Sequence, residues 1–397
     1  MPLPFLAALT TLGTTGCYTQ LRTERYAVPT AAGGPAAVPP AWRRLQQRVL
    51  QAEPAGPRAA WLATPSDLYC CPSAADLAAC AVVRRGGGVA ALAADGVGAP
   101  GGYSAVVANA TAVSVASCDG GCACTWRAAA IPPGVALGRV NAIAGDGLVG
   151  YVASSTGLWK LTASADAEPR LEAVAGVPPR TEYVAVAATD CGAQPSNRSF
   201  CVAASTLGTV SNGGCGWSTG CSAGQLWMQR SSGQWRREWT RGFFGANLTA
   251  TALAFDGRGS LWAGGEQALH QIDASTGVFQ RIGGKEGLPA NGIRSVAAAS
   301  GSAEVPAPLW LATHAGAAAR MGDGGWRWLA GPRWLGTLNA STAVSHVSAG
   351  SASALITTAD GAVARITVDT CYSLAAKTRE IQSQWPRFGW QDRKSVV

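Results

Sequence analysis

Short runs in which apolar and polar residues alternate recur along the chain, and each run closes on a glycine or an Asp-Gly pair. Alternation with a period of two that ends in this way predicts a β-strand followed by a tight turn. The runs begin at residues 89, 140, 183, 250, 293 and 344, in steps of 51, 43, 67, 43 and 51 residues. The three clearest are Val89–Gly96, Val140–Gly147 and Ala250–Gly257. The sequence therefore predicts an internal repeat made of short strands.

Each repeat has room for about four strands. After the run at Val140, for example, the stretches Leu148–Ser154 and Leu158–Leu161 are joined by a turn at Thr156 and Gly157. A repeat of this length with about four antiparallel strands is typical of a β-propeller. A single blade cannot bury both faces of its sheet, so neighbouring blades must stack around an axis. We predict an all-β fold, a propeller of six or seven four-stranded blades over residues 59–370.

Two kinds of side chain mark positions within the repeat. Small residues recur at one place in the alternating run, and the sixth copy has His346 there; the small residues are Ala91, Ala142, Ala185, Ala252 and Ser295. Small side chains suit an innermost strand, where adjacent blades crowd the axis. Tryptophan recurs on what we expect to be one other strand, at Trp61, Trp159, Trp227, Trp262 and Trp310. We interpret these rings as core between the sheets, the alternative being a stacking platform for sugars or bases.

One stretch carries a more specific pattern. It contains Leu261-Trp262-Ala263-Gly264-Gly265, Leu269-His270-Gln271-Ile272-Asp273, Thr276-Gly277-Val278-Phe279 and Gly287-Leu288-Pro289-Ala290-Asn291-Gly292-Ile293. This pattern resembles the two-component regulator propeller repeat, closely over residues 245–320 and more loosely over 85–370. The resemblance implies a seven-bladed propeller that forms the sensing ectodomain of a membrane receptor. The sequence shows no histidine kinase motif and no DNA-binding segment, so we carry over only the propeller and its binding role.

Composition narrows the class of protein. Hydrophobic residues make up 48% of the 397 residues and charged residues 14%, which excludes a disordered chain. No apolar run approaches the roughly 20 residues of a membrane-spanning helix. The net charge is +8, but basic residues cluster only in pairs such as Arg84 and Arg85, and we expect no nucleic-acid partner. We expect a monomer.

Cysteines and glycosylation sequons point to an oxidising compartment. The twelve cysteines are even in number and fall mostly in short-range clusters, which favours disulfides in a secreted or lumenal protein. Cys191 with Cys201, and Cys215 with Cys221, are expected to bridge hairpins, the second pair within an insertion between Thr206 and Gln225. The pairing of the others stays open: Cys17, Cys70, Cys71, Cys80, Cys118, Cys122, Cys124 and Cys371. Four of the seven asparagines head an Asn-X-Ser/Thr sequon and are expected to be glycosylated: Asn109, Asn197, Asn247 and Asn339.

Two possible metal sites have simpler explanations. Cys118, Cys122 and Cys124 offer three thiols to zinc, but no fourth ligand lies nearby in the sequence, so we favour disulfides. Asp95, Asp146 and Asp256 occupy equivalent Asp-Gly turns and could serve as calcium ligands, but they belong to different blades, and aspartate also favours turns by itself. We expect no metal and no cofactor.

The two ends of the chain differ from the repeats. Residues 1–58 are expected to be a leader or signal segment followed by a linker rich in Pro, Ala and Gly. Residues 371–397 are expected to form a helical tail. The last six residues, 392–397, match what a common sequencing adapter encodes, so we interpret them as an artefact and expect the natural chain to continue.

These patterns predict a secreted or lumenal binding module. The loop face and the axial funnel of the propeller would recognise a carbohydrate, a peptide or a protein, with Asn141, Arg294 and His346 lining the funnel. No catalytic residue is assigned, because the three histidines stand apart from any triad pattern. The alternative is an enzyme, either a hydrolase or lyase that uses the funnel, or the non-catalytic part of an enzyme whose catalytic domain follows residue 390.

Overall fold

The structure is a computed structural model of the 397-residue chain. It describes residues 18–26, 51–55, 59–64, 67–72, 80–85, 88–95, 102–109, 112–119, 121–145, 149–164, 167–191, 200–207, 224–230, 233–238, 249–256, 258–265, 268–290, 292–298, 308–321, 324–329, 343–350, 353–359 and 363–372. Two compact units can be distinguished, residues 24–365 and residues 1–23 together with 366–397.

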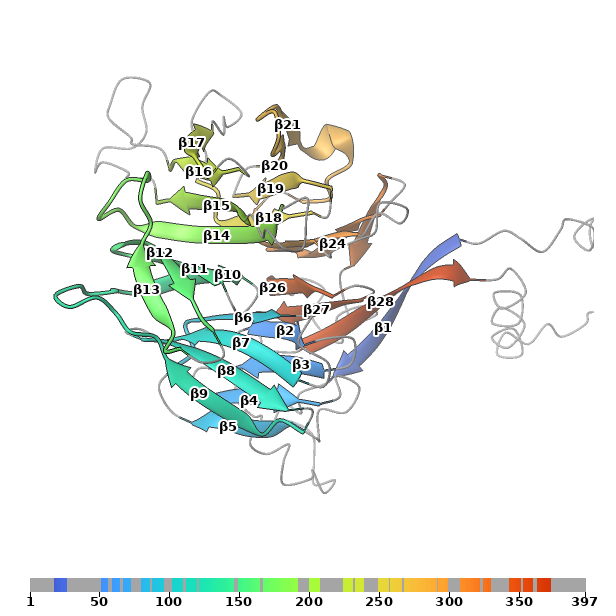
Figure 1. Ribbon diagram of the computed structural model, residues 1–397. Helices are drawn as coiled ribbons and strands as arrows, with labels where there is room; N and C mark the ends of the chain where they lie inside the picture. The colour runs from blue at the N-terminus through green and yellow to red at the C-terminus, as the bar shows by residue number, and fades with distance from the viewer. Residues whose placement is uncertain are drawn as a thin grey trace, which may run out of the picture. The chain divides into compact units, whose positions relative to one another are not determined.

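The fold is an all-β propeller of seven four-stranded antiparallel blades (Figure 1). Six blades are simple meanders with the orders β2-β3-β4-β5, β6-β7-β8-β9, β10-β11-β12-β13, β14-β15-β16-β17, β18-β19-β20-β21 and β22-β23-β24-β25. The seventh sheet has the order β26-β27-β28-β1, so its fourth strand comes from the N-terminal part of the chain. A short 3-10 helix, η2 (Gly284–Glu286), follows the fifth of these meanders.

Each blade repeats the same four strand positions. The first strands are β2 (Gln51–Ala55), β6 (Ala91–Asp95), β10 (Val140–Gly145), β14 (Tyr183–Asp190), β18 (Ala252–Phe255), β22 (Ile293–Ala298) and β26 (Val344–Ala349). The second strands are β3 (Ala59–Ala63), β7 (Gly102–Ala108), β11 (Val149–Ser154), β15 (Phe200–Thr206), β19 (Ser260–Gly264), β23 (Leu309–Thr313) and β27 (Ser353–Thr358). The third strands are β4 (Asp67–Cys71), β8 (Val113–Asp119), β12 (Gly157–Thr162), β16 (Leu226–Gln229), β20 (Leu269–Asp273), β24 (Gly316–Arg320) and β28 (Val363–Tyr372). The fourth strands are β5 (Ala81–Arg85), β9 (Cys124–Ala128), β13 (Arg170–Ala173), β17 (Trp235–Glu238), β21 (Phe279–Ile282), β25 (Trp326–Leu329) and β1 (Tyr18–Tyr26).

The seven first strands form a closed ring within residues 24–365. Each contacts the first strand of the next blade, and β26 contacts β2 to complete the circle. At that junction the hydroxyl of Ser348 donates a hydrogen bond of 2.6 Å to the carbonyl oxygen of Ala52. The alternating runs predicted to be innermost strands are therefore correctly placed in six of the seven blades.

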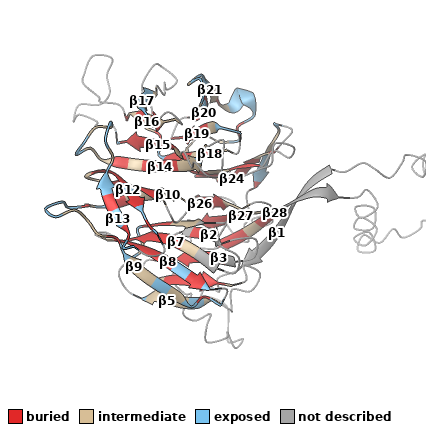
Figure 2. Ribbon diagram, in the orientation of Figure 1, coloured by how far each residue is buried: buried red, intermediate tan, exposed pale blue. Residues whose placement is uncertain are grey.

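The hydrophobic core lies between neighbouring blades. One cluster packs Val106 of β7 against Val152 of β11, and another packs Ala203 of β15 against Leu261 of β19. The fourth strands β5 and β13 are the least buried parts of their blades (Figure 2). Blades approach so closely that a Cβ added at Gly264 would lie 2.5 Å from Cγ2 of Ile293. Apolar area buried between sheets therefore holds the ring together.

The predicted tryptophan ladder is wrong in one respect, because the rings occupy two strand positions rather than one. Trp61, Trp262 and Trp310 lie on second strands, whereas Trp159 and Trp227 lie on third strands. A Leu-Trp pair can start either strand, and sequence spacing does not reveal which. The interpretation of the rings as core holds for most of them, since all but Trp227 are buried.

The predicted ends of the propeller also need correction. Strand β2 lies inside the stretch predicted to be leader and linker, and it forms the first strand of a blade. The sequence pattern does not reveal it, because Pro54 and the flanking alanines hide its alternation. At the other end, β28 extends to Tyr372, so Cys371 belongs to a strand; the rest of the predicted helical tail lies outside the described residues.

Candidate binding site in the axial channel

A cavity of about 400 Å³ lies on the axis of the ring. It is lined by residues of six first strands, β6, β10, β14, β18, β22 and β26, and most of these residues are alanine or valine. The volume is within the usual range of small-molecule sites. The small side chains on the innermost strands therefore have two effects. They allow neighbouring blades to approach one another, and they leave a cavity on the axis.

A β-bulge marks the start of the first strand in four blades. The strand register shifts at Asn141, Val184, Arg294 and Ser345, each of which is the second residue of its strand. A bulge inserts one unpaired residue and redirects its side chain. Asn141, Val184 and Arg294 all line the cavity. We call the set Asn141, Val184, Arg294 and Ser345 the bulge ring.

Most polar members of the bulge ring are held by hydrogen bonds within the protein. The Asn141 amide nitrogen donates to the carbonyl oxygen of Tyr183 at 2.8 Å and to Glu182 Oε1 at 3.2 Å, and its oxygen accepts from Arg139 Nε at 3.1 Å. The hydroxyl of Ser345 donates to the carbonyl oxygens of Thr357 and Thr358. These side chains therefore brace the strands.

Arg294 differs from the other members of the ring. Its side chain is exposed, it lines the cavity, and it makes no hydrogen bond or ion pair with any residue that the structure describes. By contrast, Arg139 at the same end of β10 forms a 2.8 Å ion pair with Glu182. A guanidinium carries five N–H donors in a planar fork, so Arg294 offers the channel a cation with its full donor set.

His346 lies on the strand next to Arg294. Its Nδ1 is 3.4 Å from the Ser295 hydroxyl oxygen, and that hydroxyl donates to the carbonyl oxygen of Val347 at 3.2 Å. The three residues that the sequence predicts for the funnel, Asn141, Arg294 and His346, thus all line one cavity. Their role in binding stays a prediction, and the bulges that aim two of them have no signal in the sequence pattern.

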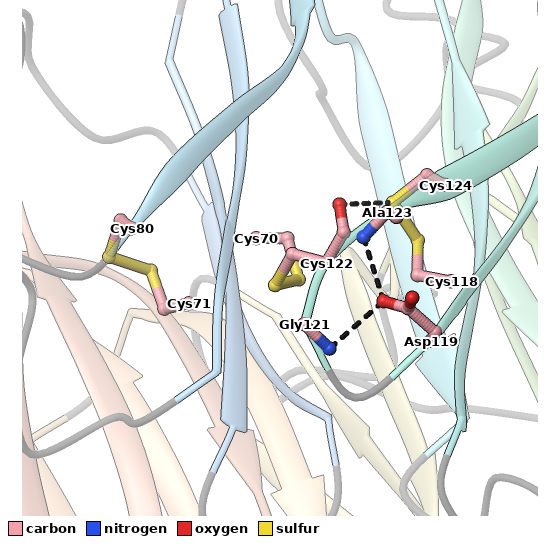
Figure 3. The surroundings of a disulfide bond; sticks show 9 residues. All are labelled: Cys70, Cys71, Cys80, Cys118, Asp119, Gly121, Cys122, Ala123 and Cys124. Carbon is pink, nitrogen blue, oxygen red and sulfur yellow. Dashed lines mark hydrogen bonds between the residues drawn. A yellow bond between two sulfur atoms is a disulfide. The ribbon is translucent and has the colours of Figure 1, made fainter.

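Four disulfides brace the described part of the chain: Cys70–Cys122, Cys71–Cys80, Cys118–Cys124 and Cys191–Cys201. The last is a pair expected from the sequence, whereas Cys215 and Cys221 lie outside the described residues. Cys118, Cys122 and Cys124 all carry disulfides, so their sulfur atoms are not thiolate ligands for zinc (Figure 3).

The loop between β8 and β9 presents Cys122 to the neighbouring blade. Asp119 Oδ1 accepts hydrogen bonds of 2.9 Å from the backbone nitrogens of Gly121 and Ala123 (Figure 3). Cys122 has a positive φ of 67°, which turns its side chain toward Cys70 on β4. The Cys70–Cys122 bond therefore links two blades, whereas the other three bonds each link residues of one blade or its connections.

Asp256 has a structural role in its Asp-Gly turn. Its Oδ1 accepts hydrogen bonds from the backbone nitrogens of Arg258 and Ser260, and its Oδ2 accepts one of 2.9 Å from Trp262 Nε1. The Asp95 side chain and Asp146 lie outside the described residues. Within the described part of the chain, no three acidic, histidine or cysteine side chains gather as a metal site would require.

Comparison with known proteins supports the fold. No protein-family model and no curated protein matches the chain. Among solved structures, it resembles the extracellular domain of the one-component system BT4673 from B. thetaiotaomicron, with a TM-score of 0.52 and 13% identity. That match covers 80% of this chain and 38% of the other, so the chain spans about two fifths of that protein.

Two further propellers match over nearly their whole lengths. Catalytically inactive virginiamycin B lyase from Staphylococcus aureus, solved with quinupristin, has a TM-score of 0.53 and 9% identity over 88% of this chain and 99% of the other. YCF48 bound to D1 peptide has a TM-score of 0.52 and 12% identity over 88% and 97%. At these identities the likeness shows the propeller fold alone, and membership of the two-component regulator propeller family stays a prediction.

Proposed function

We propose that the chain is a binding module of the extracellular or lumenal space, which recognises a carbohydrate, peptide or protein through its axial channel and the adjoining loop face. The axial cavity of about 400 Å³ carries the proposal, because Arg294 supplies it with donors that no residue in the described part of the chain occupies. A rigid ring of blades keeps such a site formed without ligand, which lowers the entropic cost of binding. The likeness to propellers solved with a peptide or with quinupristin is consistent with this role.

The proposed compartment rests on the covalent structure. Four disulfides in the described residues are the pattern of a protein that folds under oxidising conditions. Of the four proposed glycosylation sites, Asn109 lies in the described residues, half-buried in the turn between β7 and β8, while Asn197, Asn247 and Asn339 lie outside them. No helix in the described residues is long and apolar enough to cross a membrane. Mass spectrometry of the secreted protein checks the proposal, and unmodified sequons with free thiols would contradict it.

A channel-filling variant tests the binding function. Ala90 lines the cavity and is exposed, so Ala90→Trp adds bulk to the channel at little cost in stability. The matched control is Ala128→Trp, because Ala128 is an exposed alanine on the fourth strand β9. The purified full chain would be screened against arrays of oligosaccharides and peptides. We expect binding that Ala90→Trp abolishes and Ala128→Trp preserves. A screen without binders, or binders indifferent to Ala90→Trp, would refute the proposal.

A second candidate function is a lyase or hydrolase that works in the same channel. It is favoured by the observation that His346 and Arg294 line one cavity, where they could act as a proton carrier and an anion stabiliser. Incubating any array ligand with the protein and measuring its mass separates the two functions. If the ligand is converted and His346→Gln abolishes the conversion, the protein is an enzyme. If the mass of the ligand does not change, the proposal of a binding module stands.

A further inference from the structure

We infer that the channel selects ligands by a carboxylate group, which Arg294 binds through its guanidinium fork. This inference deepens the proposed function and rests on it. The carboxylate could belong to an acidic sugar or to the C-terminus of a peptide, since both present the same planar pair of oxygens. Three features of the channel lead to this ligand class: the direction of the Arg294 side chain, the hydrogen bonds that neighbouring polar groups already make, and the charge of the lining.

The backbone directs the Arg294 side chain toward the axis. The register shift between Ile293 and Ser295 leaves Arg294 unpaired in the β22–β23 ladder, and an unpaired bulge residue can aim its side chain away from the sheet. Ile293 and Ser295 on either side are buried, whereas Arg294 is exposed and lines the cavity. The charge of Arg294 therefore faces the channel and not the core between the blades.

Neighbouring polar groups of the lining already have partners. Asn141 bonds to Tyr183 and Glu182, and the lining residue Ser348 donates to the carbonyl oxygen of Ala52. The Thr251 hydroxyl, which also lines the cavity, donates to the carbonyl oxygen of Ile293 at 3.3 Å. A ligand gains little from groups whose hydrogen bonds are satisfied. Among these polar side chains, Arg294 is the one with a full set of donors to offer within the described part of the protein.

The charge of the lining favours an anion. Arg294 and His346 are the ionisable residues that line the cavity, and no carboxylate lines it among the described residues. Glu182, which accepts a hydrogen bond from the lining residue Asn141, is paired with Arg139 at 2.8 Å. A single guanidinium fork matches the two oxygens of a carboxylate, whereas phosphate sites usually add several backbone N–H donors. A carboxylate is therefore the anion that this channel fits.

The test compares acids with their neutral counterparts on the 397-residue chain. Isothermal titration would use glucuronic acid against its methyl ester, and a tripeptide mixture with free C-termini against the same mixture amidated. Two variants remove the same charge: Arg294→Gln in the channel and Arg258→Gln in the β18–β19 turn, where Arg258 is exposed. Arg294→Lys keeps the charge but loses the fork. Because both arginines are exposed, circular dichroism melts should match those of the parent.

We expect the parent to bind an acid at least about tenfold more tightly than its neutral counterpart, as a charge-assisted bidentate contact provides. Arg294→Gln should abolish that preference, Arg294→Lys should restore part of it, and Arg258→Gln should leave it intact. Preference for the sugar acid alone identifies an acidic sugar, and preference for the peptides alone identifies a chain terminus. Equal binding of acids and neutral forms, or an equal loss in both glutamine variants, would overturn the inference. If neutral ligands bind and Ala90→Trp blocks them, the proposed function survives without the carboxylate.

Discussion

Removing the disulfide between Cys70 and Cys122 should destabilise the propeller more than removing the one between Cys71 and Cys80. Cys70 and Cys71 are adjacent on β4 and both have 0% exposure. Their side chains point to opposite faces of the sheet, so Cys70 packs against the blade β6–β9 and Cys71 against residues of β27 and β28. The first bond joins two blades across 52 residues of sequence, whereas the second closes a hairpin across nine.

The difference follows from the entropy of the unfolded chain. A cross-link that closes a longer loop removes more conformations from the unfolded state. Applied to the two sequence separations, the chain-entropy relation gives a loss of about 4 kcal/mol for the Cys70–Cys122 bond and about 2.5 kcal/mol for the Cys71–Cys80 bond. The packing cost is similar for the two pairs, since each change to alanine removes two sulfur atoms. We therefore expect the variants to differ by about 1.5 kcal/mol.

Guanidinium unfolding followed by tryptophan fluorescence measures both effects. The variants are Cys70→Ala with Cys122→Ala, and Cys71→Ala with Cys80→Ala, each in the 397-residue chain with the other disulfides intact. The guanidinium concentration at the midpoint of unfolding should fall further in the variant without Cys70 and Cys122. The slope of the unfolding free energy against guanidinium concentration reports the surface exposed on unfolding, so it should rise more in the variant that lacks the Cys70–Cys122 bond, which releases the longer loop. Equal losses in the two variants, or a larger loss for the Cys71–Cys80 pair, would refute loop entropy as the main contribution of the inter-blade bond.

Two further predictions follow from buried aromatic side chains. In urea unfolding, Trp262→Phe should lower the free energy of unfolding by about 1–3 kcal/mol more than Trp310→Phe does. The reason is that Trp262 Nε1 donates a hydrogen bond to Asp256, whereas the buried Trp310 Nε1 has no hydrogen-bond partner in the described structure. Equal losses would show that this hydrogen bond contributes nothing. Burial raises the pKa of the Tyr183 phenol, which donates to the carbonyl oxygen of Pro178. The unfolded chain therefore releases this proton first, and stability present below about pH 10 is lost as pH rises further. Tyr183→Phe should make alkaline unfolding less steep, and an unchanged pH profile would show that another group controls it.

The repeat pattern was enough to predict much of the architecture, whereas the cysteine spacing predicted one of the four described disulfides, Cys191–Cys201. Alternation with a period of two, closed by Asp-Gly turns, is a local signal, and it located six of the seven first strands. The same locality explains what failed. Strand β2 contains Pro54 and has weak alternation, and it belongs to a blade because β3 and β26 lie beside it. Trp159 and Trp262 each belong to a Leu-Trp pair but lie at different strand positions, because the position depends on how many strands precede the pair within its blade.

The candidate site shows the same division between local and long-range information. The small residues and His346 could be assigned to innermost strands from the sequence, because their spacing repeats with the blade. The bulge at Arg294, the ion pair that occupies Arg139, and the bond that joins Cys70 to Cys122 depend on contacts between segments far apart in the chain. The sequence by itself therefore determined the blade and its repetition. Only the tertiary structure decided that seven blades close into a ring. It also decided which polar side chains form hydrogen bonds and ion pairs between segments, and that Arg294 faces the channel.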